Sequence, residues 1–294
     1  MTHAANEPRI DRTVAAPDGR RIGVAEFGSP DGPVVVLLHR SPGSRLLDPD
    51  PAATGAAGVR LVCVDRPGYG ATDPVAASTR AAAADDLEAV VGALGLDGVA
   101  LVGWSGGGQF AVEAAARPGV RARSLALLAT PAPYYELPWP LPPELVALCD
   151  AVPDDPAAGL RAIRAAMGWF ADAPETAALG DPSPADAAAR ELPGVADALV
   201  AMTAEAARQG AEGIAFDIVA GSLRDPLPFA AIDVPVDVFH GDADLNVGLE
   251  HLDWWAERLP GAQRHVLADT GHLLAMTHWR EILAGAAAAA AAVV

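Results

Sequence analysis

Short apolar runs alternate with longer alanine-rich segments along most of the chain. The apolar runs cover residues 34–38, 60–64, 99–102, 124–129 and 235–239. A continuous run of this kind is typical of a strand that is buried on both faces. Between them, helical spacing is found at residues 79–94, 105–117 and 249–259, and glycine or proline follows each segment. The alternation predicts βαβ units with right-handed crossovers and a mostly parallel sheet.

Three further segments are predicted to be strands. Residues 10–15 and 21–27 flank the turn sequence Pro17-Asp18-Gly19, so we expect them to form a hairpin. Residues 264–267 form a shorter candidate near the end of the chain. The predicted fold class is therefore α/β, with a mostly parallel eight-stranded sheet flanked by helices.

One long segment interrupts this alternation. Residues 131–228 open with a cluster of prolines and contain no convincing buried strand, and there is no internal repeat. Helix-like stretches follow the prolines at residues 145–151, 157–170, 185–190, 195–208 and 212–223. We therefore expect a helical cap over residues 131–228, inserted after the sixth strand into a core domain formed by residues 1–130 and 229–294.

Composition and charge exclude several classes of protein. Hydrophobic residues make up 51% of the 294-residue chain and charged residues 20%, which argues against disorder over the whole chain. The formal net charge of −18 argues against binding to nucleic acid or to an anionic membrane surface. The expected partner is a small-molecule substrate.

The ends of the chain and its two cysteines favour a cytoplasmic protein. Residues 1–12 lack the apolar stretch of a secretory signal. Residues 282–294 are mostly Ala and Gly, fall short of the ~20 apolar residues needed to cross a bilayer, and are predicted to form a fraying terminal helix. Cys63, expected in a buried strand, and Cys149 form no CxxC motif, so neither a zinc ribbon nor a disulfide framework is predicted.

The clearest chemical signal is Gly103-Trp104-Ser105-Gly106-Gly107, at the junction of a predicted strand and a predicted helix. The pattern G-x-S-x-G in this context is typical of a nucleophile elbow. A sharp turn holds the serine in a strained conformation, and glycines let the flanking chains pass close by. Ser105 is therefore the candidate nucleophile, and the N–H of Gly106 is a candidate donor to a developing oxyanion.

A serine hydroxyl needs a general base that is itself held by an acid. Asp244 follows the predicted strand 235–239, and His272 follows the strand 264–267. Loops after the carboxyl ends of parallel strands face one crevice. We therefore expect Ser105, Asp244 and His272 to meet in space.

Each of these assignments has an alternative. Asp242 is the other candidate acid, but Asp244 lies further into the loop and is better placed to reach an imidazole, so Asp242 is assigned to the surface or to a turn. The alternative bases are expected to be structural: His251 and His265 as ordinary surface residues, His278 near a helix start, His240 supporting the loop after its strand, and His3 in the amino-terminal segment.

These motifs resemble those of α/β-hydrolase-fold proteins, in particular the lid-containing family of esterases and related hydrolases. The resemblance runs from about residue 10 to about residue 282, and it includes the chain order Ser, Asp, His. It also includes His39-Arg40-Ser41-Pro42-Gly43 and Asp65-Arg66-Pro67-Gly68-Tyr69-Gly70. The second of these segments is expected to be structural, with Asp65 and Arg66 hydrogen-bonded to neighbouring backbone. The resemblance implies no cofactor and no metal.

The segment after His39 resembles the family's H-G-x-P-G loop, which supplies a second oxyanion donor. By position that donor is the backbone N–H of Ser41, while Arg40 replaces the family's glycine. Three interpretations stay open: Arg40 points to solvent, it enters the pocket to hold a carboxylate, phosphate or enolate-like oxygen, or it distorts the oxyanion hole. The Ser41-Pro42 bond is a candidate for a cis peptide.

Aromatic residues of the predicted cap are candidates to line a pocket. Trp and Phe at helical spacing more often pack in a core than contact a ligand, but together they suggest a substrate with an apolar or aromatic portion. The candidate contacts are Tyr134, Tyr135, Trp139, Trp169, Phe170 and Phe216, with Trp104 beside the nucleophile.

The expected function is hydrolysis of a small ester, lactone or related acyl compound through an acyl-enzyme on Ser105. A serine rather than a carboxylate at this position argues against the epoxide hydrolases and haloalkane dehalogenases that share the fold. A C–C bond hydrolase, a cofactor-free haloperoxidase-like enzyme and a non-hydrolytic ligand-binding protein are the alternatives. The sequence leaves the oligomeric state open, with a homodimer as one option.

Overall fold

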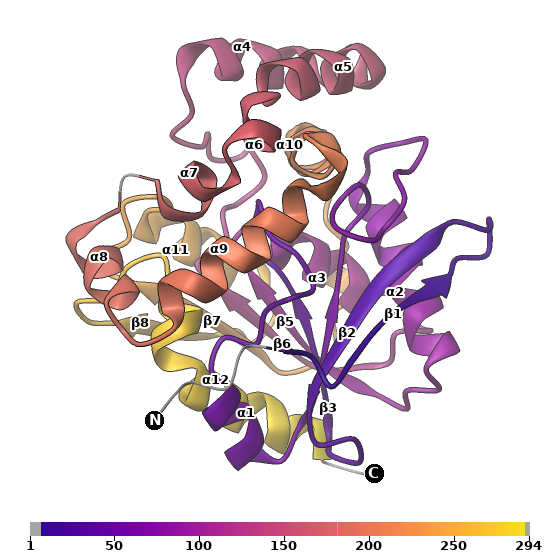
Figure 1. The fold of residues 1–294 in the computed structure, drawn as a ribbon, viewed down its shortest axis with the longest axis vertical. Helices are drawn as coiled ribbons and strands as arrows, with labels where there is room; N and C mark the ends of the chain where they lie inside the picture. Colours follow the sequence, from indigo (N-terminus) through magenta and orange to yellow (C-terminus); the bar gives the residue numbers. More distant parts are fainter. Residues whose placement is uncertain (1–6, 181, 292–294) are drawn as a thin grey trace.

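A computed structural model describes residues 7–180 and 182–291. An eight-stranded sheet runs through the molecule in the order β1-β2-β4-β3-β5-β6-β7-β8 (Figure 1). β2 is antiparallel to both β1 and β4, and the other neighbours are parallel. The strands are β1 Ile10–Ala15, β2 Arg21–Gly28, β3 Val34–Leu38, β4 Arg60–Val64, β5 Val99–Trp104, β6 Ala122–Leu128, β7 Val236–Gly241 and β8 Gln263–Leu267.

Helices cover both faces of the sheet, which explains why its central strands are continuously apolar. One face packs against α1 (Pro51–Ala57) and α12 (Leu274–Ala291) in one buried cluster. The other face packs against α2 (Arg80–Ala93), α3 (Gly107–Ala115) and α11 (Leu249–Arg258). The predicted α/β fold with eight strands is therefore confirmed, and the strand bounds differ from the predicted ones by at most two residues.

The predicted helices differ from the structure in four places, one of which is the short helix α7 (Pro174–Leu179), which was not predicted. Helix α1 was not predicted; it begins after Asp50, whose side chain accepts hydrogen bonds from the N–H groups of Ala52 and Ala53. The predicted helix 157–170 is two helices, α5 (Pro156–Ala166) and α6 (Trp169–Asp172). The terminal helix α12 begins well before residue 282 and has a kink at His278, and residues 292–294 of the predicted tail lie outside the described residues.

The segment between β6 and β7 is helical throughout its regular structure, as predicted. In Figure 1 its first helices, α4 and α5, lie at the end of the molecule farthest from β3. The helices are α4 Pro143–Ala151, α5 Pro156–Ala166, α6 Trp169–Asp172, α7 Pro174–Leu179, α8 Pro184–Arg190, α9 Val195–Ala206 and α10 Glu212–Ser222, with 3₁₀ turns at Ala207–Gln209 and Phe229–Ala231. We refer to residues 131–228 as the helical insertion; its division from the core as a separate subdomain stays a prediction.

Two further expectations concern the cysteines and the membrane. Cys63 lies buried in β4 as predicted, and Cys63 and Cys149 are both free thiols. Among the described helices, none combines the length and the apolar character that crossing a bilayer requires.

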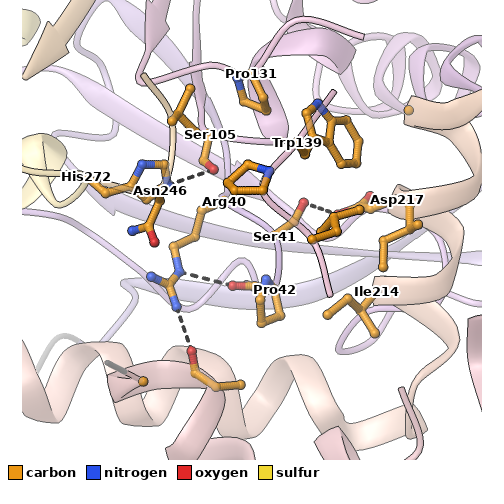
Figure 2. Close-up of a pocket in the computed structure, with 18 of the residues that line it drawn as sticks. Arg40, Ser41, Pro42, Ser105, Pro131, Trp139, Ile214, Asp217, Asn246 and His272 are labelled. Atoms are coloured by element: carbon orange, nitrogen blue, oxygen red, sulfur yellow. Dashed lines mark hydrogen bonds between the residues drawn. The ribbon is translucent and has the colours of Figure 1, made fainter. Parts of the chain in front are cut away.

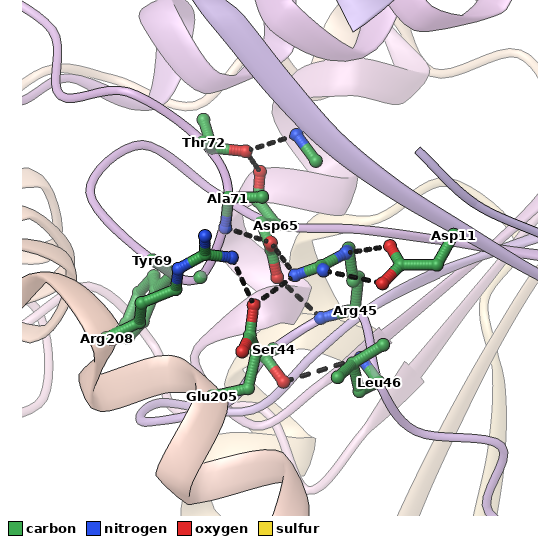
Figure 3. A network of polar contacts seen from close by, with 12 residues as sticks. Asp11, Ser44, Arg45, Leu46, Asp65, Tyr69, Ala71, Thr72, Glu205 and Arg208 are labelled. Atoms are coloured by element: carbon green, nitrogen blue, oxygen red, sulfur yellow. Dashed lines mark hydrogen bonds and ion pairs between the residues drawn. The ribbon is translucent and has the colours of Figure 1, made fainter. Parts of the chain in front are cut away.

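A buried arginine ties the edge of the sheet to the helical insertion (Figure 3). The guanidinium of Arg45 is only 4% exposed and forms ion pairs with Asp11 of β1 at 2.7 Å, with Asp65 after β4 at 2.8 Å and with Glu205 of α9 at 2.6 Å. Asp65 also accepts hydrogen bonds from the backbone N–H groups of Arg45 and Ala71, which is the structural role predicted for it. Burial raises the pKa of Asp65 to about 6, although Arg45 opposes the shift.

Replacing Arg45 with methionine is expected to lower the free energy of unfolding by roughly 3–5 kcal/mol, because Asp65 would be left buried without its cation. Arg21→Met is the matched control: Arg21 pairs with Asp73 but is 68% exposed, so its loss is expected to stay within about 1 kcal/mol. Urea unfolding of the two variants and the wild type measures both effects. Equal losses would contradict the structural role of Arg45.

Candidate active site

The turn between β5 and α3 holds Ser105 in a left-handed conformation with φ of 54°. Close approach of the flanking chains requires the glycines around it. A Cβ atom on Gly103 would lie 2.5 Å from the Cα of Gly108, and one on Gly107 would lie 2.3 Å from the carbonyl oxygen of Leu38. These contacts leave no room for a larger residue, which is the steric basis of the predicted elbow.

The structure brings Ser105, His272 and Asp244 together, although they are far apart in the sequence. The Nε2 atom of His272 lies 2.8 Å from the Oγ of Ser105, and its Nδ1 atom lies 2.8 Å from the Oδ2 of Asp244. All three side chains are buried. Figure 2 shows the imidazole turned toward the serine hydroxyl at the edge of a cavity.

The carboxylate of Asp244 is held by its own loop. Its Oδ1 atom accepts hydrogen bonds from the N–H groups of Asn246 and Val247. Burial by itself would raise the pKa of Asp244, but His272 and these two N–H groups outweigh burial and lower the pKa. The alternative acid, Asp242, is exposed. At neutral pH Asp244 is therefore ionised and oriented toward the imidazole.

Among the described residues, none of the alternative bases is hydrogen-bonded to Ser105. His240 is buried and its Nε2 lies 2.8 Å from the carbonyl of Val247, so it supports the loop as expected. The surface prediction for His251 is wrong: it is buried, lines the cavity, and its Nδ1 accepts a hydrogen bond from the N–H of Ala132. His265 is half-buried against Asp237, His278 lies at the kink inside α12 rather than at a helix start, and His3 lies outside the described residues.

The two predicted oxyanion donors, the backbone N–H groups of Ser41 and Gly106, belong to chain segments that lie side by side. Gly106 follows the nucleophile, and a Cβ atom built on it would lie 2.3 Å from the Oγ of Ser41 and 3.8 Å from its backbone nitrogen. Neither N–H donates to an acceptor elsewhere in the described residues. The Ser41-Pro42 peptide bond is cis. The two donors are thus adjacent and unused, as an oxyanion site requires.

A buried ion pair fixes the loop that carries Ser41. Arg66 donates to both carboxylate oxygens of Asp217 on α10 and to the carbonyl oxygens of His39 and Arg40. Asp217 also accepts hydrogen bonds from the hydroxyls of Tyr69 and Ser41. The structural role predicted for Arg66 is confirmed, whereas nothing in the sequence singled out Asp217.

The catalytic candidates open into a cavity of about 400 Å³. Most of its wall comes from the helical insertion. The remainder comes from the loops after β3, β5 and β7, from α3 and α11, and from His272. Arg40 lines this cavity and is only 8% exposed, so the interpretation that it points to solvent is wrong. Its guanidinium donates to the carbonyl oxygens of Pro42 and Ala177 at 3.2 Å each (Figure 2).

Of the predicted aromatic contacts, the structure places only Trp139 in the wall of this cavity. Trp104 is fully buried, packs in the core on the side of α12, and donates from its Nε1 to the carbonyl of His272. Tyr134 and Tyr135 lie at a separate hollow. Trp169 is 46% exposed, and Phe170 and Phe216 are buried in the core clusters. The wall is consequently less aromatic than predicted.

The described residues offer no candidate metal site beside the three proposed catalytic side chains. Within residues 7–180 and 182–291 there is no group of three or more His, Cys, Asp or Glu side chains that could hold a metal ion.

A family model for the α/β-hydrolase fold matches residues 33–278. The chain belongs to this family. The match includes the elbow, the acid loop and the histidine loop of this α/β-hydrolase, and it confirms the resemblance seen in the sequence.

Proteins similar to this α/β-hydrolase carry names that indicate different functions. A probable oxidoreductase, EphD, from Mycobacterium tuberculosis is 42% identical over 89 residues, which are 29% of this chain and 15% of EphD. The chain thus matches only a small part of that curated relative.

A thermophilic esterase from Thermogutta terrifontis, solved with malate bound, is 25% identical with a TM-score of 0.66, covering 95% of this chain and 96% of the esterase. An α/β-hydrolase fold protein from Nakamurella multipartita is 26% identical with a TM-score of 0.68, covering 95% and 99%.

The contribution of the Arg66–Asp217 pair is measurable in a double-mutant cycle. Arg66→Met and Asp217→Asn are each expected to lower the free energy of unfolding by roughly 3–5 kcal/mol, because each leaves an unpaired buried partner. The double variant is expected to lose clearly less than the two single losses added together. Additive losses in chemical unfolding would contradict direct coupling between the loop and α10.

Proposed function

We propose that this α/β-hydrolase is a serine hydrolase that cleaves a small ester, lactone or related acyl compound. The observation that carries the proposal is the continuous hydrogen-bonded chain from Ser105 through His272 to Asp244 at the edge of the cavity. The esterase from Thermogutta terrifontis is consistent with it, since that protein has the same fold over nearly the whole chain.

In the first step the Oγ of Ser105 attacks the carbonyl carbon of the substrate. The Nδ1–H of His272 donates to Asp244, which leaves Nε2 free to take the serine proton as the C–O bond forms. The negative charge that develops on the carbonyl oxygen is stabilised by the N–H groups of Ser41 and Gly106. Ionised Asp244 stabilises the imidazolium.

In the second step the tetrahedral intermediate collapses. His272 returns its proton to the departing alcohol, or to the hydroxyl end of an opened lactone, and the acyl group stays on Ser105. Water then attacks the acyl-enzyme while His272 takes one of its protons, and the carboxylic acid is released when the proton returns to Ser105. Every proton is exchanged through one nitrogen, Nε2 of His272.

Ser105→Ala is expected to lower kcat for a p-nitrophenyl ester by several orders of magnitude, up to roughly a millionfold. A fluorophosphonate probe should label the wild type at Ser105, as read by peptide mass spectrometry, and should not label the variant. Turnover of a β-diketone but of no ester would favour the C–C hydrolase alternative. Failure of the wild type both to react with the probe and to turn over any substrate would contradict a hydrolytic role.

Two neighbouring aspartates provide a matched comparison. Asp244→Asn is expected to lower kcat by roughly 10³- to 10⁴-fold, because the amide favours the wrong tautomer of His272. Asp242→Asn removes the same charge from an exposed position of the same loop and should retain kcat within about twofold. Steady-state kinetics of the two variants decide between the acids, and a larger loss in Asp242→Asn would reverse the assignment.

A further inference from the structure

Two guanidinium groups in the cavity wall have no carboxylate partner among residues 7–180 and 182–291. Arg40, in the loop after β3, donates only to two backbone carbonyls. Arg190, the last residue of α8, makes no side-chain hydrogen bond or ion pair within the described residues, and its Nε atom is buried without a partner. Both line the same cavity as Ser105 and His272. Within the part of the chain that the structure describes, the cavity therefore holds two cationic groups that no carboxylate neutralises.

Other buried arginines show how unusual it is for a guanidinium in the interior to lack a carboxylate partner. Arg45 is paired with three carboxylates, and Arg66 is paired with both oxygens of Asp217. Arg80 is likewise held by carbonyls rather than by a carboxylate, but it does not line the cavity. Of the described arginines, only Arg40 and Arg190 combine the lack of a carboxylate partner with a place in the cavity next to Ser105.

The two groups also repel each other. Burial, and after it the positive charge of Arg190, lowers the pKa of Arg40 to about 10, while Asp186 acts in the opposite direction. The carboxylate of Asp186 is already used by the hydroxyl of Ser183 and the N–H of Leu273. Asp217, the acidic residue in the cavity wall, is already neutralised by Arg66. An anion between the two arginines would relieve their repulsion.

We propose that Arg40 and Arg190 form a subsite for a carboxylate of the substrate. This inference rests on the proposed function and narrows it: the enzyme acts on acyl compounds that carry a second, free carboxylate, such as half-esters of dicarboxylic acids or carboxylated lactones. The guanidinium fork of Arg190 has no partner among the described residues and can make a bidentate contact, whereas Arg40 already donates from Nε and one terminal nitrogen to carbonyls. The net charge of −18 does not attract anions, so selection for a carboxylate must come from this local pair.

The test compares two substrates that differ only in one charge. The mono-p-nitrophenyl ester of glutaric acid carries a free carboxylate, and its methyl ester does not. In the wild type the ratio of kcat/KM for the charged over the neutral substrate is expected to be about 10- to 100-fold. Arg190→Met and Arg40→Met should each reduce that ratio by roughly tenfold or more. Arg161→Met, which removes an exposed arginine from the same insertion, should leave the ratio within twofold.

Binding measurements separate this proposal from the proposed function. Calorimetry with Ser105→Ala should show tighter binding of the charged half-ester than of its methyl ester, and a second change, Arg190→Met, should abolish the difference. That result would support the subsite even if the wild type hydrolysed nothing. Hydrolysis of both esters with a ratio near one in wild type and Arg190→Met would overturn the subsite and leave the hydrolase standing. Stronger inhibition by inorganic phosphate than by glutarate would also overturn the carboxylate assignment.

Folding is checked in the same samples. Because Arg40 and Arg190 lack carboxylate partners, their replacement by methionine should leave the thermal midpoint unchanged or raise it. A marked fall in the midpoint of both variants would show that the two arginines stabilise the fold instead, and it would overturn the proposal.

Discussion

The ion pair between Arg66 and Asp217 connects the two parts of the chain that build the cavity. Arg66 follows β4 and Asp217 lies on α10, so the pair joins the core to the helical insertion while both side chains are almost fully buried. The same guanidinium holds the carbonyls of His39 and Arg40. The position of the Ser41 N–H relative to Gly106 thus depends on a contact with a helix that is about 150 residues away in the sequence. A shift of α10 would move one of the two proposed oxyanion donors.

The fold and the three catalytic candidates could be predicted because their signals are local. Apolar runs predict the strands, and the glycines around Ser105 predict the elbow. Because loops after the carboxyl ends of parallel strands face one crevice, Asp244 and His272 are expected beside Ser105. None of these steps requires knowledge of how the helices of the insertion pack. The choice of Asp244 over Asp242 followed from loop position alone, and the structure turns the former inward and leaves the latter exposed.

The cavity wall was predicted less well because it depends on contacts between distant segments. The direction of Arg40 is set by the carbonyl of Ala177, which lies 137 residues further along the chain. Trp104 was expected beside the substrate, but successive strand residues point to opposite faces, so it joins Ala100 and Val102 in the core on the side of α12. His251 was expected at the surface because helical periodicity does not reveal which neighbour covers a face. Asp217 lies on α10, a helix that is buried on nearly all sides. In such a helix the hydrophobic pattern of the sequence does not show which polar residue forms an ion pair.

The helical insertion leaves and re-enters the sheet between β6 and β7, which are hydrogen-bonded neighbours. The length of the insertion therefore does not affect the geometry of the sheet. Recombination at two adjacent points of the fold can replace the whole insertion. Under the proposed function, bond cleavage and substrate choice would be inherited largely separately, since the proposed triad lies in the core and most of the cavity wall lies in the insertion. The exception is the pair of cavity arginines, one from each part. A lineage that exchanged the insertion would keep the proposed triad but would have to acquire the second arginine again.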